Sequence, residues 1–170
     1  VKEKNILEKT NIDRANEFNL TGCINFYKVE FNNVKMNIND ANCEDALNIL
    51  NSKGTISELN INNSYADGFD ADFSDLTILN LNIKNAFNDC ADFSLGKYYI
   101  KNADLNFCGD KGISIGENSY MEIENLKSYY SNIALASKDS SKTKIISGEI
   151  ENVKYCVSAY KKKQEFNGSL

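Results

Sequence analysis

Histidine and proline are missing from this chain, and arginine nearly so. The 170 residues include no histidine, no proline and a single arginine, Arg14. Without histidine, the chain has no Ser-His-Asp triad, no Cys-His pair, no histidine-ligated zinc and no histidine acid or base. One arginine and a net charge of −5 provide no cluster of cations to neutralise phosphates, so we expect no nucleic-acid partner.

Membrane insertion is not expected either. The chain begins with Val1, and residues 1–10 are charged and lack the apolar stretch of a signal peptide. No apolar run approaches the 18 residues or so that would span a bilayer. We interpret the chain as a piece of a longer protein, whose other domains and targeting signal would lie outside it.

The five cysteines are odd in number and include no Cys-x-x-Cys pair. They are Cys23, Cys43, Cys90, Cys108 and Cys156. Such spacing is typical neither of a disulfide framework nor of a zinc site. We therefore expect buried thiols that act as small apolar side chains.

A short apolar pattern recurs every 22 or 23 residues. Isoleucine is followed three positions later by an apolar or small residue, and an apolar residue comes two positions after that. The clearest copies are Ile56/Leu59/Ile61, Ile78/Leu81/Ile83 and Ile100/Ala103/Leu105, and weaker ones are Ile123/Leu126/Ser128 and Ile145/Gly148/Ile150. A repeat of this length indicates a solenoid built from one small unit per turn.

A second element repeats with nearly the same step. Alternating apolar pairs run from Ile24/Phe26 through Leu47/Ile49 to Val157/Ala159, and the sixth pair is predicted to be Ala134/Ala136. A period of two indicates strands. The sequence therefore predicts an all-β fold, a parallel β-helix of about seven turns of 21–23 residues, over residues 23–170. Residues 1–22 would form an incomplete first turn or an N-terminal cap.

The prediction explains the composition. Asparagine, with 26 copies, tolerates the left-handed corners that end each strand, and it also stacks in ladders. Proline would remove a hydrogen-bond donor from strands that are mostly internal.

Several segments together resemble a known family. They are GCINFYK (22–28), EDALNIL (44–50), DGFDADFS (67–74), GDKGISIGENS (109–119), ASKDSS (136–141) and AYKKKQEF (159–166). They resemble a bacterial right-handed parallel β-helix of the pectate-lyase-like superfamily, and more closely the β-helix regions carried beside CotH-kinase-like domains in large surface proteins. The resemblance covers residues 19–170 and implies right-handed winding and an extracellular or cell-surface location.

The resemblance also bears on activity. Enzymes of this superfamily include pectate lyases, with calcium-binding aspartates and an Arg or Lys base, and polygalacturonases, which use aspartates with a histidine. This chain has no histidine and no arginine in the predicted helix body. Of these schemes, only a lysine-based lyase or epimerase stays open.

Six aspartates are predicted to gather on one face of three consecutive turns. They are Asp45, Asp67, Asp70, Asp72, Asp89 and Asp92, the aspartate patch. Asp70 and Asp72 lie two residues apart on one strand, and Asp92 would stack on Asp70 in the next turn. Like charges this close destabilise a sheet, so something must compensate for them.

Three explanations are open for the aspartate patch. A bound Ca²⁺ ion would suit several carboxylate ligands. Raised carboxyl pKa values would provide a catalytic acid or base, with Asp70, Asp92 and Lys111 as candidate catalytic residues. Hydrogen bonds to turn amides and to neighbouring lysines would make the patch purely structural.

Tyrosines are weaker candidates for ligand binding. Tyr98, Tyr99 and Tyr120 could stack on sugar rings, although packing on the sheet surface is the ordinary role of such residues. The leading prediction is a non-catalytic module that binds polysaccharide or another surface partner, with Ca²⁺ at the aspartate patch as the one cofactor considered. A lysine-based lyase or epimerase and a purely structural spacer are the alternatives.

Overall fold

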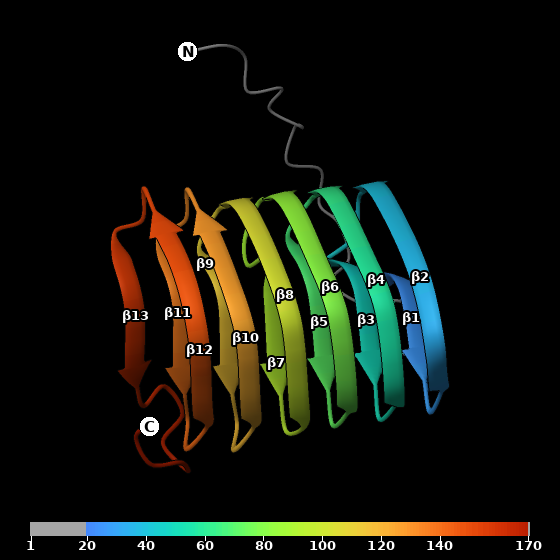
Figure 1. Cartoon of the computed structure of the whole chain (residues 1–170). Helices are drawn as coiled ribbons and strands as arrows, with labels where there is room; N and C mark the ends of the chain where they lie inside the picture. The colour runs from blue at the N-terminus through green and yellow to red at the C-terminus, as the bar shows by residue number, and fades with distance from the viewer. Residues whose placement is uncertain (1–19, 170) are drawn as a thin grey trace.

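The computed structural model describes residues 20–169 and is an all-β parallel β-solenoid (Figure 1). Each turn contributes one short strand and one long strand, and the turns stack side by side into two facing sheets. About six turns are present, close to the predicted seven. The right hand of the winding stays a prediction, and most of the predicted cap at residues 1–22 lies outside the described residues.

The two sheets are each formed by successive turns. The short strands pair in the order β1 (Gly22–Tyr27), β3 (Asp45–Leu50), β5 (Asp67–Asp72), β7 (Ala91–Ser94), β9 (Lys111–Gly116), β11 (Ile133–Lys138) and β13 (Tyr155–Tyr160). The long strands pair in the order β2 (Glu30–Ala41), β4 (Lys53–Ser64), β6 (Asp75–Ala86), β8 (Lys97–Cys108), β10 (Tyr120–Tyr129) and β12 (Lys142–Glu151). Within residues 20–169, no helix is long and apolar enough to cross a membrane.

The core lies between the two sheets and confirms the apolar repeat. Ile56, Ile78, Ile100 and Ile123 occupy equivalent positions in neighbouring turns and are fully buried. Each isoleucine covers the one in the next turn, at the strand spacing of about 4.8 Å. A turn cannot bury this face alone, so stability comes from stacking.

Two corners in each turn place a residue in the left-handed backbone region. One corner follows each short strand from β1 to β11, and the other lies near the end of each long strand. At the second corner, Asn63 donates to Asp40 (2.8 Å) and Asn85 donates to Asn63 (2.9 Å). Phe107 and Tyr130 continue the series as stacked rings, with centroids 4.6 Å apart. Asparagine therefore accounts for only part of the corner chemistry.

The register of the sixth short strand differs from the sequence prediction. Leu135 pairs with Ile113 and Ser137 pairs with Ile115, so the inward pair is Leu135/Ser137 and not Ala134/Ala136. Both faces of β11 are buried, with Ala134 and Ala136 fully buried as well. Apolar residues therefore occupy both sets of positions, and alternation could not reveal the phase.

The expectation of buried free thiols is wrong. Cys23 bonds to Cys43 and Cys90 bonds to Cys108, whereas Cys156 is free and exposed. The partners are 20 and 18 residues apart. Nothing in such separations indicates contact until the chain is wound into a turn that returns to its starting point.

The disulfides predict how many thiols are reactive. A thiol reagent is expected to label one cysteine per chain, Cys156, in the native protein. The count should stay at one after denaturation without a reductant and rise to five after reduction, which tests the assay itself. Five reactive thiols in the unreduced, denatured protein would contradict the pairing.

Candidate functional site

The six aspartates of the patch lie at or beside three consecutive short strands. Asp45 pairs in register with Asp67, and Asp70 pairs with Asp92. Asp45 and Asp89 are only 3% exposed, however, and so do not face solvent. The patch is therefore largely part of the packed structure.

Two of these carboxylates hold neighbouring turns together. Asp67 Oδ1 accepts hydrogen bonds from the Asp89 backbone N–H (2.8 Å) and the Asn88 side chain (2.7 Å). Asp89 Oδ1 in turn accepts from the Lys111 backbone N–H at 3.0 Å. Each carboxylate thus bonds the equivalent amide of the next turn, which supports the structural explanation for this column.

Burial and mutual repulsion change the protonation of the patch. Burial raises the pKa of Asp45 to about 7, although a hydrogen bond with Thr21 opposes the rise. Burial and the charge of Asp92 raise the pKa of Asp72 to about 6. The pKa of Asp70 lies well above its usual value, chiefly through burial and then through the charge of Asp72.

The six aspartates do not converge on one point. Among residues 20–169, no three Asp, Glu, Cys or His side chains lie together in an arrangement that could hold a metal ion. A calcium site at the aspartate patch stays a prediction of the sequence.

Lys111, the candidate base, is held as an ammonium. Its Nζ lies 3.3 Å from both carboxylate oxygens of Asp89 and also donates to Asp110. Burial acts to lower the pKa of Lys111, but the hydrogen bond with Asp110 and the charge of Asp89 outweigh it, and the pKa is raised. A protonated amine does not accept a proton, so this geometry does not suit a lyase base.

The three candidate tyrosines lie in two different environments. Tyr98 is 1% exposed, and its hydroxyl lies 2.8 Å from the carbonyl oxygens of Ala71 and Ser94, so it belongs to the core. Tyr99 and Tyr120 lie on the outer face of the long-strand sheet, where their hydroxyls donate to Glu124 and Glu122. Tyr120 is exposed and Tyr99 is half-buried, so a ligand on this face could reach the ring of Tyr120 more readily.

Rows of asparagine on the long-strand sheet form a second candidate site, which the sequence analysis missed. Asn60 donates to Asn37 and Asn82 donates to Asn60, each at 2.7 Å. In a second row, Asn102 donates to Asn80 (3.0 Å) and Asn125 donates to Asn102 (3.1 Å). Side-chain amides are thus joined from turn to turn across the outer face of this sheet.

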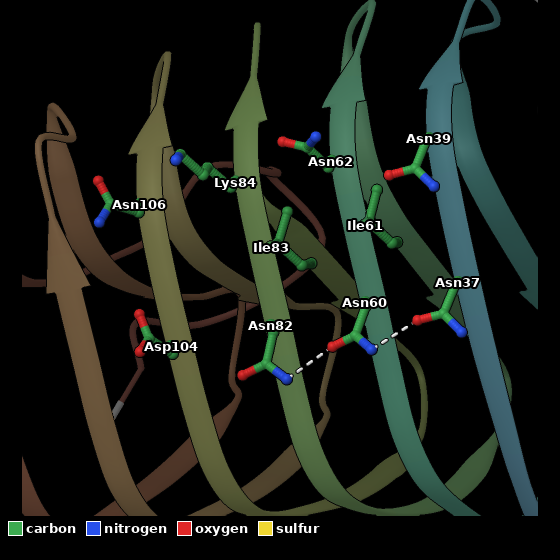
Figure 2. Close-up of a pocket in the computed structure, with 10 residues that line it drawn as sticks. All are labelled: Asn37, Asn39, Asn60, Ile61, Asn62, Asn82, Ile83, Lys84, Asp104 and Asn106. Carbon is green, nitrogen blue, oxygen red and sulfur yellow. Dashed lines mark hydrogen bonds between the residues drawn. The ribbon is translucent and has the colours of Figure 1, made fainter.

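A shallow groove of about 520 Å³ lies over the first of these rows. We call it the amide groove; it is lined by Asn37, Asn39, Asn60, Ile61, Asn62, Asn82, Ile83, Lys84, Asp104 and Asn106. Figure 2 shows the bonded amides of Asn37, Asn60 and Asn82 in one line, with Asn62, Lys84 and Asn106 in a second line beside it. The groove therefore offers mostly uncharged donors and acceptors; Asp104 follows Asn82 in the first line, and Lys84 belongs to the second line.

A signal for these rows was present in the sequence. Asn37, Asn60 and Asn82 are separated by 23 and 22 residues, the same step as the apolar repeat. The apolar positions and the short-strand columns alone do not reveal the rows. Tracing each polar residue type at the repeat length would have found the rows.

Comparisons with protein-family models, with curated proteins and with solved structures find no match to this chain.

Proposed function

We propose that this chain is a non-catalytic β-solenoid module that binds a polysaccharide in the amide groove. The observation that carries the proposal is the hydrogen-bonded row of Asn37, Asn60 and Asn82 in a groove on a flat sheet. An amide offers two N–H donors and an oxygen with two lone pairs, which matches hydroxyl groups that both donate and accept. A row of amides thus suits a ligand that repeats hydroxyls along its length.

The hydrogen bonds within the row favour binding in a second way. An exposed asparagine would lose rotamer freedom on binding a ligand, at a cost in affinity. Bonds of 2.7 Å to its neighbours already fix Asn60 in the free protein. The row is therefore preorganised; the Asn60 N–H groups bond Asn37 and Glu58, so this residue offers its oxygen to a ligand hydroxyl, and Asn37 and Asn82 keep N–H donors on either side.

The charges around the groove favour an uncharged glycan. Lys84 and Asp104 contribute one positive and one negative group, and the chain as a whole carries −5. An acidic glycan would be repelled by that net charge and would find one lysine in the groove. Tyr129 continues the row of Asn106 in the next turn, where a ring could stack on a sugar.

The cellular location is part of the proposal. Two disulfides favour an oxidising compartment, such as the exterior of a cell. This agrees with the exported or surface protein implied by the resemblance to bacterial right-handed β-helices of the pectate-lyase-like superfamily. A lyase or epimerase is not proposed, because Lys111 is held protonated by Asp89 and Asp110.

Binding can be tested by affinity electrophoresis and calorimetry on a panel of neutral and acidic polysaccharides. We expect at least one neutral polysaccharide to retard the protein. Replacing both Asn60 and Asn82 with alanine should weaken its binding about tenfold or more, since each lost hydrogen bond is worth about 1 kcal/mol.

The matched control is Asn125→Ala, which removes an amide of the second row on the same sheet outside the groove lining. It should bind as the unmodified protein does. Equal weakening by Asn125→Ala would contradict the groove, and an absence of binding across the panel would favour the structural spacer.

A further inference from the structure

Three parallel rows of side-chain amides cross the outer face of the long-strand sheet. On β6, Leu81 and Ile83 are buried in the core. Asn80, Asn82 and Lys84 alternate with them and therefore point outward. Each of the three belongs to a different row, because successive turns pair in register. We call the asparagines of these rows the amide grid: Asn37, Asn60 and Asn82; Asn39, Asn62 and Asn106; and Asn80, Asn102 and Asn125.

The amide grid has a regular spacing in two directions. Equivalent residues in neighbouring turns are about 4.8 Å apart, and residues two positions apart on one strand are about 6.6 Å apart. The row of Asn80 runs through Asn102 and Asn125 to Ser147 on β12. Together with the row of Asn37, which runs from β2 to β6, it places uncharged polar groups on every strand of this sheet.

Hydrogen bonds fix the row of Asn102 as they fix the row of Asn60. Asn102 donates to Asn80 at 3.0 Å, and Asn80 donates to the Ser57 carbonyl oxygen at 3.2 Å. The Ser147 hydroxyl donates to Asn125 at 2.5 Å. Side-chain ladders of this kind also help to keep a sheet of many strands flat. The positions of these amides are therefore set before any ligand binds.

A single soluble chain in the amide groove would contact only part of the grid. The groove is lined by the row of Asn60 and the row of Asn62, whereas the row of Asn102 lies outside its lining. A solid built from parallel chains repeats its hydroxyl groups in two directions, so it can meet all three rows at once. After one row has bound, the other two add contacts without a second loss of translational and rotational freedom.

The rigidity of the grid also favours an ordered ligand. A flexible chain in solution loses conformational freedom when a fixed row of amides aligns it, and this loss opposes binding. A chain that is held in a crystal has already lost that freedom. Bracing of neighbouring turns is the other role open to the outer row, and it would make no difference between an ordered and a flexible ligand.

We propose that the ligand of this module is the surface of a solid, ordered neutral polysaccharide, which binds across all three rows of the amide grid. This class of ligand depends on the function proposed above and makes it more specific, since parallel chains packed in a solid replace a single chain in solution. The row of Asn102 then binds ligand together with the two rows that line the groove.

The test is co-sedimentation of the 170-residue chain with microcrystalline cellulose and microcrystalline chitin, each compared with its own amorphous form. Binding isotherms give a dissociation constant for each solid. We expect at least one crystalline solid to bind about tenfold or more tightly than its amorphous form. Equal constants, or binding of a soluble neutral polysaccharide but of neither crystalline solid, would overturn the ordered ligand and leave the proposed function standing. Binding of no polysaccharide in any form would overturn both.

The double variant Asn102→Ala/Asn125→Ala removes two amides of the row outside the groove. It should weaken binding to the crystalline solid about tenfold or more and leave binding to a soluble polysaccharide unchanged. The matched control is Asn88→Ala/Asn132→Ala, because these amides also bond to the preceding turn, at 2.7 and 3.1 Å, but lie outside the long-strand sheet. The control should bind the solid as the unmodified protein does, and melting curves check that both variants are folded. Equal binding of the solid by the two double variants would overturn the role of the outer row.

Discussion

Lowering the pH from 8 to 5 is expected to stabilise this protein, whereas many proteins are most stable near neutrality. Burial raises the pKa of Asp45 to about 7, burial and Asp92 raise that of Asp72 to about 6, and burial keeps that of Asp70 well above the ordinary value. In the unfolded chain, these groups titrate near pH 4. Between that pH and the raised values, the folded state binds more protons, so stability falls as the pH rises.

The expected effect is large because several groups act in the same direction. Each pH unit is worth at most about 1.4 kcal/mol per group. Even a fraction of the combined contribution of Asp45, Asp70 and Asp72 should raise the melting temperature by about 5 °C or more when the pH is lowered from 8 to 5. Thermal denaturation followed by circular dichroism at constant ionic strength measures it.

Asp70→Asn tests whether the aspartate patch causes this pH dependence. The substitution keeps an oxygen for the hydrogen bond from Asn48 and removes the ionisable group. It should raise the melting temperature at pH 8 and reduce its dependence on pH. Asp104→Asn, an exposed carboxyl on the other sheet, should leave the pH dependence unchanged. If melting temperatures fall from pH 8 to pH 5, or if both variants behave alike, the interpretation of the patch is wrong.

Removing the Tyr98 side chain is expected to produce the largest loss of stability among the tyrosines, about 3–5 kcal/mol for Tyr98→Ala. Its ring packs against Phe93 with centroids 4.8 Å apart, and Phe93 packs in turn on Phe69. Removal would leave a cavity between the two sheets. Chemical denaturation measures the free energy of unfolding.

The hydroxyl of Tyr98 makes a separate contribution. In two other turns, a serine at the first corner bonds back to the carbonyl two residues earlier, Ser52 to Leu50 and Ser74 to Asp72. Gly96 occupies this position in the turn that follows Ser74, and the Tyr98 hydroxyl bonds to the Ser94 carbonyl instead. Tyr98→Phe should therefore cost about 1–3 kcal/mol, because the hydrogen bond of a buried hydroxyl is lost, although the Ser94 carbonyl still accepts from the Phe73 backbone N–H.

Tyr120→Phe serves as the control. Among residues 20–169, its hydroxyl donates to the surface carboxylate of Glu122, so the change should stay within about 0.5 kcal/mol. A Tyr98→Phe variant as stable as the unmodified protein would show that the Tyr98 hydroxyl does not take the role of the serine hydroxyl at this corner.

The sequence was informative where one face of a strand is buried and the other is not. The spacing of Ile56, Ile78 and Ile100 predicted the turn length and the register, because these positions point into the core in every turn. It failed at β11, where Ala134 and Ala136 are as buried as Leu135. Alternation disappears when both faces are covered.

The prediction of free thiols was wrong, and the burial of one candidate tyrosine was not foreseen, for different reasons. Cys90 meets Cys108 only because β7 and β8 wind round one turn, and a separation along the chain does not contain that information. Adjacent tyrosines on one strand point to opposite faces, so Tyr98 enters the core while Tyr99 faces outward. Predicting which one is buried requires the register, which Ile100, two residues further along the same strand, and its counterpart Ile78 in the preceding turn would have provided.

The two disulfides also affect how the solenoid would respond to mechanical force. Each joins two residues of a single turn and links no turn to its neighbour. A pull on the ends of the chain would thus peel turns apart one by one, breaking strand pairs while the two bonded loops stay closed. The 18-residue separation of Cys90 and Cys108 corresponds to about 60 Å of extended chain. This part of the chain cannot extend until the disulfide is reduced. The redox state of Cys90 and Cys108 therefore determines how far the protein can stretch.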